Sequence, residues 1–260
     1  MLLSAYTLAL DAVVGGFLKA VLPLVRGFDV RDAGDRKKLE KPLHDLVSSY
    51  RGDAVLAANQ YMVEAAQELG KQAYIPPSDP YPVEAVRSTL RGYKSAQGVV
   101  DALARHVLAG ARRQVQRATP DDPYAPGAPS SVGPLKSGSQ RGAGSSGPQL
   151  EVESATVHPV SWARVLTGAE NCAFCVMLAS RGARYSSKTR AGGAKDDAYR
   201  FHDNCDCLVV PVYDFDDWPG KETADYLYEQ VWKKSGAGSI EELAAYLKEN
   251  PANVPDIRAG

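Results

Sequence analysis

The sequence has almost no net charge and few histidines. Its 30 basic and 31 acidic side chains leave a formal net charge of -1. Overall charge therefore gives no argument for nucleic-acid binding, and any basic surface has to be local. The four histidines are the main bases open to a catalytic site: His44, His106, His158 and His202. The chain contains neither the GxSxG of an α/β-hydrolase nor the GxxxxGK[ST] of a phosphate-binding loop, and it contains no repeated unit.

The longest apolar run, residues 2–25, lacks the marks of an export signal or a membrane span. No Lys or Arg precedes it, and it is not followed by a small-residue cleavage site. Asp11 and Lys19 interrupt it, as do two glycines and a proline. We expect a buried amphipathic helix, no membrane contact and a reducing cytoplasm. In that compartment the four cysteines are expected to be free or bound to metal rather than paired in disulfides.

The composition divides the chain into three parts. Residues 1–118 have the apolar periodicity of helices, interrupted between Pro76 and Pro82, and form a predicted helical docking domain. In residues 119–150, 18 of 32 positions are Gly, Pro or Ser, a composition typical of a flexible linker. Residues 151–260 form a second, mixed domain. The predicted class is α+β, a helical domain joined by a linker to a small α/β domain built around a metal knuckle.

Local patterns predict the elements of the second domain. Alternating apolar and polar residues indicate a strand at 150–157, and residues 161–166 suggest a short helix. A second strand is expected at 208–213, where Pro211 favours a sheet edge. Residues 223–233 have a helical pattern, and a last helix begins at Ser239, with Glu242 in place for a capping box. The three tryptophans, Trp162, Trp218 and Trp232, are expected in the core of this domain.

All four cysteines lie within one short stretch that also contains a histidine. Cys172 and Cys175 form a CxxC, and His202, Cys205 and Cys207 form an HxxCxC. Two such knuckles can close a tetrahedron of thiolate and imidazole ligands, which suits Zn²⁺. Because five candidate ligands compete for four places, one of the three in the second knuckle is spare. The sequence therefore predicts one structural zinc ion per chain.

Other interpretations of the cysteines stay open. They can be buried thiols, two disulfides, or a redox pair at Cys172 and Cys175, although no thioredoxin-like βαβ pattern surrounds that pair. A catalytic zinc would need an open coordination position and a nearby base. Glu170 is close in sequence, but five potential protein ligands favour a filled, structural site.

The surroundings of the cysteines resemble a phage protein family. Residues 162–168, the Cys-Ala-Phe-Cys turn at 172–175, Ala-Ser-Arg-Gly at 179–182 and Phe-His-Asp-Asn-Cys-Asp-Cys at 201–207, followed by Val-Pro at 210–211, are similar to the C-terminal motif of Mu F-like head proteins. Asp203 stands where that family usually has proline. The resemblance implies a portal-associated minor capsid component in the virion head. It also implies assembly in the host cytoplasm, with the portal and the major capsid or scaffold proteins as partners.

Related chains of actinobacterial phages are labelled capsid maturation proteases, which gives an alternative function. If the chain is a protease, His158 and Ser161 are the candidate catalytic residues, with an aspartate from 214–217 to orient the histidine. No catalytic constellation is visible, so the non-enzymatic function is favoured. A zinc-stabilised toxin-like or DNA-contact module is a third possibility. Arg105, Arg112, Arg113 and Arg117 could touch packaged DNA, or form an ordinary solvated helix face.

Overall fold

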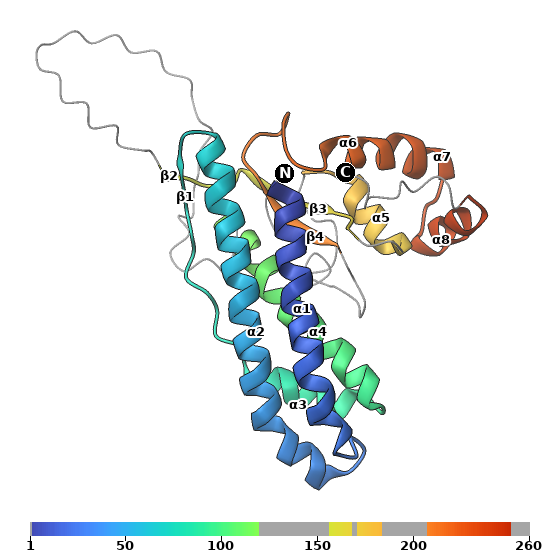
Figure 1. Cartoon of the computed structure of the whole chain (residues 1–260). Coiled ribbons are helices and arrows are strands. Elements are labelled where there is room, and N and C mark those ends of the chain that lie inside the picture. The colour runs from blue at the N-terminus through green and yellow to red at the C-terminus, as the bar shows by residue number, and fades with distance from the viewer. Residues whose placement is uncertain (1, 120–155, 168–170, 184–206, 251–260) are drawn as a thin grey trace, which may run out of the picture.

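The structure is a computed structural model, and it describes residues 2–119, 156–167, 171–183 and 207–250. Within these ranges the chain is mostly helical, with two small two-stranded sheets, which agrees with the α+β class in its coarse form (Figure 1). The predicted linker lies almost entirely outside the described residues, as do His202, Cys205 and most of the strand expected at 150–157. The division into two domains stays a prediction.

Four helices form the N-terminal part: α1 (Leu2–Arg26), α2 (Ala33–Glu68), α3 (Val83–Gly92) and α4 (Ala96–Ala118). The helical interpretation of residues 1–118 is therefore confirmed. The boundaries follow from capping side chains, because the carboxylate of Asp32 accepts the backbone N–H of Asp35 at 2.9 Å, and the hydroxyl of Ser95 accepts that of Gly98 at 3.1 Å. Because Ser95 is the N-cap of α4, the helical residues 83–118 form two helices, α3 ending at Gly92 and α4 beginning at Ala96.

Helix α1 is buried along one stripe rather than all round. The buried positions repeat at helical spacing and pack against α2 and α4: Tyr6, Leu10, Phe17, Val21 and Val25. Its length and composition would allow it to cross a membrane, but such a helix near an N-terminus is weak evidence for that, since a core helix passes the same test. The expected amphipathic helix is present, and the outer part of its surface is less buried than we expected.

The C-terminal part alternates short strands and helices. Strand β2 (Thr156–Val157) pairs in parallel with β1 (Gln72–Ala73), and β3 (Ser161–Val165) pairs antiparallel with β4 (Leu208–Val212), with Arg164 opposite Val209. Helix α5 (Ala173–Ser180) lies between the strands in sequence. After β4 come α6 (Lys221–Tyr226), a π-helical turn η2 (Leu227–Trp232), α7 (Lys233–Ser235) and α8 (Ile240–Glu249).

One predicted element is wrong and several are confirmed. Residues 161–165 form strand β3, not a helix. Every residue of β3 is buried, so the polar–apolar alternation that reveals a half-exposed strand is missing. The strand at 208–212, the helical stretch from 221 and the capped helix after Ser239 are all present. Trp162 and Trp218 are buried as expected, whereas Trp232 is half-buried.

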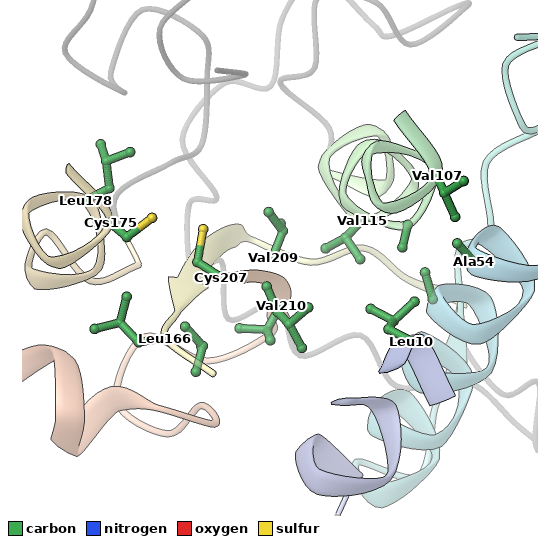
Figure 2. Packing of buried hydrophobic residues seen from close by; sticks show 14 of the residues in the cluster. Leu10, Ala54, Val107, Val115, Leu166, Cys175, Leu178, Cys207, Val209 and Val210 are labelled. Atoms are coloured by element: carbon green, nitrogen blue, oxygen red, sulfur yellow. The ribbon is translucent and has the colours of Figure 1, made fainter. Parts of the chain in front are cut away.

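The two parts of the chain pack on each other through one continuous apolar core. Leu10, Ala54 and Val115 from the helices belong to the same cluster as Val209 and Val210 of β4 (Figure 2). Polar contacts cross the same boundary: the hydroxyl of Tyr213 donates to the carbonyl of Met62 at 3.3 Å. Because α4 packs directly on β4, the helical part forms one wall of the region that contains the cysteines.

Candidate metal centre

The first knuckle begins a helix. Cys172 is the N-cap of α5, and its sulfur accepts the backbone N–H of Cys175 at 3.3 Å. A sulfur at this position faces the positive end of the helix dipole and a backbone donor, both of which favour negative charge on the sulfur. Cys175 is buried in the first turn, and Cys172 is half-buried. The CxxC therefore has the local geometry that holds thiolate ligands.

Cys207 is placed by the second strand. It immediately precedes β4, and its side chain is 1% exposed. Figure 2 shows the sulfur atoms of Cys175 and Cys207 directed into the same space between α5 and the β3–β4 pair. Arg164, on β3, contacts both Cys207 and helix α5 through its guanidinium. Nη1 lies 3.6 Å from the sulfur of Cys207, and Cζ lies 6.0 Å from the centre of the Phe174 ring on α5.

Two arginines are buried beside Cys207. Arg164 contacts its sulfur, and Nε of Arg112, from α4, donates to its backbone carbonyl at 3.1 Å. Each of the two side chains is 1% exposed. A buried guanidinium is costly unless negative charge or good acceptors surround it. Thiolates of a metal site supply such charge, so the arginines fit a centre of anionic sulfur ligands.

Three of the five candidate ligands are therefore visible and two are not. Cys172, Cys175 and Cys207 form no disulfide with one another, and His202 and Cys205 lie outside the described residues. Among the side chains that the structure describes, no group of three His, Cys, Asp or Glu is gathered closely enough to hold a metal. The described contacts, a backbone N–H at the sulfur of Cys172 and a guanidinium at the sulfur of Cys207, would suit anionic sulfur. The zinc ion and its ligand set stay a prediction.

The candidate catalytic residues are engaged elsewhere. The hydroxyl of Ser161 is fully buried and donates to the carbonyl of Ala183 at 2.9 Å. Nδ1 of His158 lies 3.3 Å from the carbonyl of Ala118, and its ring stacks on Tyr74 with centroids 4.2 Å apart. The His158 contact ties the chain after β2 to the end of α4, and the Ser161 bond ties the start of β3 to the turn after α5. They lend no support to a nucleophile–base pair between the two residues.

The arginines of α4 are less open than their sequence suggested. Arg112 and Arg117 are buried, and Arg117 forms an ion pair with Asp79, from which Arg113 is 3.9 Å distant. Arg105 is half-buried. Arg112 and Arg117 cannot reach DNA while the core is packed. The DNA contact stays a prediction that depends on Arg105 and Arg113.

Sequence reasoning missed Arg164 and misjudged Arg112. Arg164 is the one charged side chain in β3, flanked by Ala163 and Val165, and a charge within an apolar strand is a signal for a buried ionic partner. Arg112 belonged to a basic cluster, and nothing in a single helix separates the arginine that faces the core from those that face solvent. Only the packing of α4 on β4 shows that Arg112 faces the core.

Comparison with known proteins finds a matched region that includes Arg164 and the described cysteines but not Arg112. Residues 151–234 match the family model described as VG15 protein. Gene 15 protein of Mycobacterium phage L5 is 34% identical over 124 residues, covering 35% of this chain and 42% of that protein. Gene 15 protein of Mycobacterium phage D29 is 35% identical over 108 residues, covering 32% and 39% respectively. The chain is similar to phage proteins.

The matched region contains the candidate metal centre. It begins at residue 151, where the predicted second domain begins, and includes β3, α5, β4 and the described cysteines. The chain spans about two fifths of the length of the curated relatives that it matches. No solved structure matches this chain. The Mu F-like assignment stays a prediction, since the matched family has a different description.

Proposed function

We propose that the protein is a head component of a bacteriophage, a minor capsid protein docked at the portal, with a structural zinc site in its C-terminal part. The observation that carries the proposal is the arrangement around Cys207 and the CxxC, where a buried guanidinium and a helix N-terminus both favour sulfur anions. This arrangement lies inside the region that matches the VG15 protein family, and the chain is also similar to a mycobacteriophage protein. The head role itself draws on the resemblance of the motif to Mu F-like proteins.

Zinc has a clear physical task at this place. Helix α5 and the start of β4 come from distant parts of the C-terminal sequence, and the sheet that they border has only two strands. A small sheet and a short helix bury limited apolar area, so a metal that binds both segments contributes directly to folding stability. The zinc would hold the C-terminal part in the shape that packs against α4. It is not assigned a catalytic step.

The helical part would supply the docking surface. It is built from long helices with well-defined caps, and its core is continuous with the cysteine region. A rigid connection between the two would let the metal centre set the orientation of the helices toward a portal or shell protein. The contacts of His158 and Ser161 do not favour the protease alternative.

The test uses phage particles that carry this gene. Mass spectrometry of purified heads should find the uncut chain in low copy, and cross-linking should join it to the portal. His158→Ala should leave the major capsid protein processed as in the wild type, whereas Cys207→Ser should reduce incorporation of the chain. The proposal fails if the chain is absent from heads. It fails equally if His158→Ala blocks capsid processing while the mutant chain is incorporated normally.

A further inference from the structure

The outer face of α1 is apolar and has no covering element among the described residues. In its most apolar 18-residue window, with a mean hydropathy of 1.9, only 22% of the positions are buried. Figure 1 shows α1 at the outside of the helical part, backed by α2 and α4. Leu8 is 68% exposed, and Leu56 on the neighbouring α2 is 65% exposed. These exposed apolar side chains make the outer side of α1 a candidate association surface.

A glycine lies in the middle of this face. A Cβ atom added at Gly15 would meet nothing within 4 Å, whereas one at Gly16 would lie 3.1 Å from the ring of Tyr50 on α2. Gly15 therefore faces away from the protein, and Gly16 faces the neighbouring helix. A glycine on an exposed helix face weakens the helix and offers no side chain for packing in the single chain. It does allow the backbone of a second helix to come close.

Two charges are arranged symmetrically about this glycine. Asp11 and Lys19 are the charged residues of α1 before Arg26, and both are exposed. Each lies four positions from Gly15, so all three fall on one row along the helix. Neither Asp11 nor Lys19 takes part in the ion pairs that the described helical residues form.

We propose that two copies of the chain associate through this face, with the α1 helices antiparallel and crossing at Gly15. In that arrangement Asp11 of one protomer lies beside Lys19 of its partner, and the twofold symmetry forms this ion pair twice. A parallel pair would instead place aspartate beside aspartate and lysine beside lysine. The apolar residues around the row, Leu8 among them, become buried between the two copies. This interface is independent of the proposed head role and of zinc.

The length of α1 suits such a dimer. With 25 residues, α1 is about 37 Å long, so two antiparallel copies that cross at Gly15 can pack along about seven turns of helix. A membrane or an unrelated helix could also cover an apolar face. Neither would explain why the two opposite charges stand at equal distances on either side of the exposed glycine.

Charge reversal gives the sharpest test, with the full chain studied by sedimentation and light scattering. The wild type should approach twice 27.9 kDa as its concentration rises. Asp11→Lys alone, or Lys19→Asp alone, should weaken association about tenfold or more, because each creates two like-charge contacts. A mixture of the two single variants should form a heterodimer, since every contact across it is again opposite in charge. The double variant should associate like the wild type.

A second pair of variants tests the crossing point without disturbing the fold. Gly15→Leu meets open space within the protomer, so its melting temperature should not fall, yet it should abolish association. Gly92→Leu, at another open helical glycine, should leave association unchanged. The proposal is overturned if the wild type stays monomeric at every concentration. It is also overturned if the mixture of charge variants fails to associate, or if α1 binds neutral lipid vesicles and no dimer forms.

Discussion

Replacing Arg164 with methionine tests whether the region around Cys207 is built for anionic sulfur. The guanidinium lies 3.6 Å from the sulfur of Cys207 and is almost fully buried. Methionine reproduces the apolar stem of arginine without its charged end, so it keeps the packing next to β3 and removes the guanidinium from the ring of Phe174. If zinc thiolates occupy this site, the substitution removes a positive charge that stabilises them.

The size of the effect follows from the contact. Hydrogen bonds to charged groups contribute about 1.5–3 kcal/mol, and the long distance here argues for the lower end of that range. About 1.4 kcal/mol corresponds to a tenfold change in a binding constant. Arg164→Met should therefore weaken zinc binding roughly tenfold, within the range seen when residues that orient metal ligands are changed.

The assay is a competition titration of zinc between the full chain and a chromophoric chelator. Arg112→Met is the matched control, because Arg112 is equally buried but donates to the carbonyl of Cys207 instead of its sulfur. It should lower the free energy of unfolding by about 1–3 kcal/mol through the unsatisfied carbonyl and change zinc affinity much less. Equal affinity of Arg164→Met and the wild type would refute the proposed role of the guanidinium.

Three further outcomes are expected. Burial raises the pKa of Tyr213 from 10.0 to about 12, so the neutral phenol is favoured in the folded state. The free energy of unfolding, measured with urea, should therefore fall as the pH rises from about 10 to 12, and it should fall less steeply in Tyr213→Phe. Val209→Ala in β4, which is fully buried, should cost about 2 kcal/mol in one cooperative transition, and two separate transitions with only one shifted would contradict the shared core. Limited trypsin should cut first at Lys136 or Arg141 in the predicted linker, and the fragments should stay together on gel filtration; first cuts inside α1–α4 would argue against the linker.

The sequence allowed the elements of the fold to be predicted where local signals are strong. Apolar periodicity, the proline-rich break and the capping residue Ser239 lead directly to helices that the structure contains. Strand β4 was also predictable, because five apolar residues, three of them β-branched valines, stand between polar segments. Strand β3 was not, since all five of its residues are buried and it lacks the alternation of polar and apolar residues that reveals a half-exposed strand.

The spacing of the cysteines can be read from the sequence, and their surroundings cannot; the metal that they are expected to bind stays a prediction. The spacing of Cys172 and Cys175 identifies a knuckle, and the structure shows the helix that it caps. The association of Cys207 with Arg164 and Arg112 depends on contacts between residues 43 and 95 positions apart, which no local pattern encodes. The bond of His158 to Ala118 likewise arises from packing between the two parts of the chain, and Ser161 donates to Ala183, 22 positions away in the C-terminal part.

The most direct test of the account is the zinc content of the purified full chain together with its thermal stability. Elemental analysis should find one zinc per chain after expression with zinc supplied, and Cys172→Ser or Cys207→Ser should lower both the zinc content and the melting temperature. Chelator should lower the melting temperature of the wild type in the same way. A chain that holds no zinc, and whose melting temperature is unaffected by either serine variant, would contradict the structural metal centre.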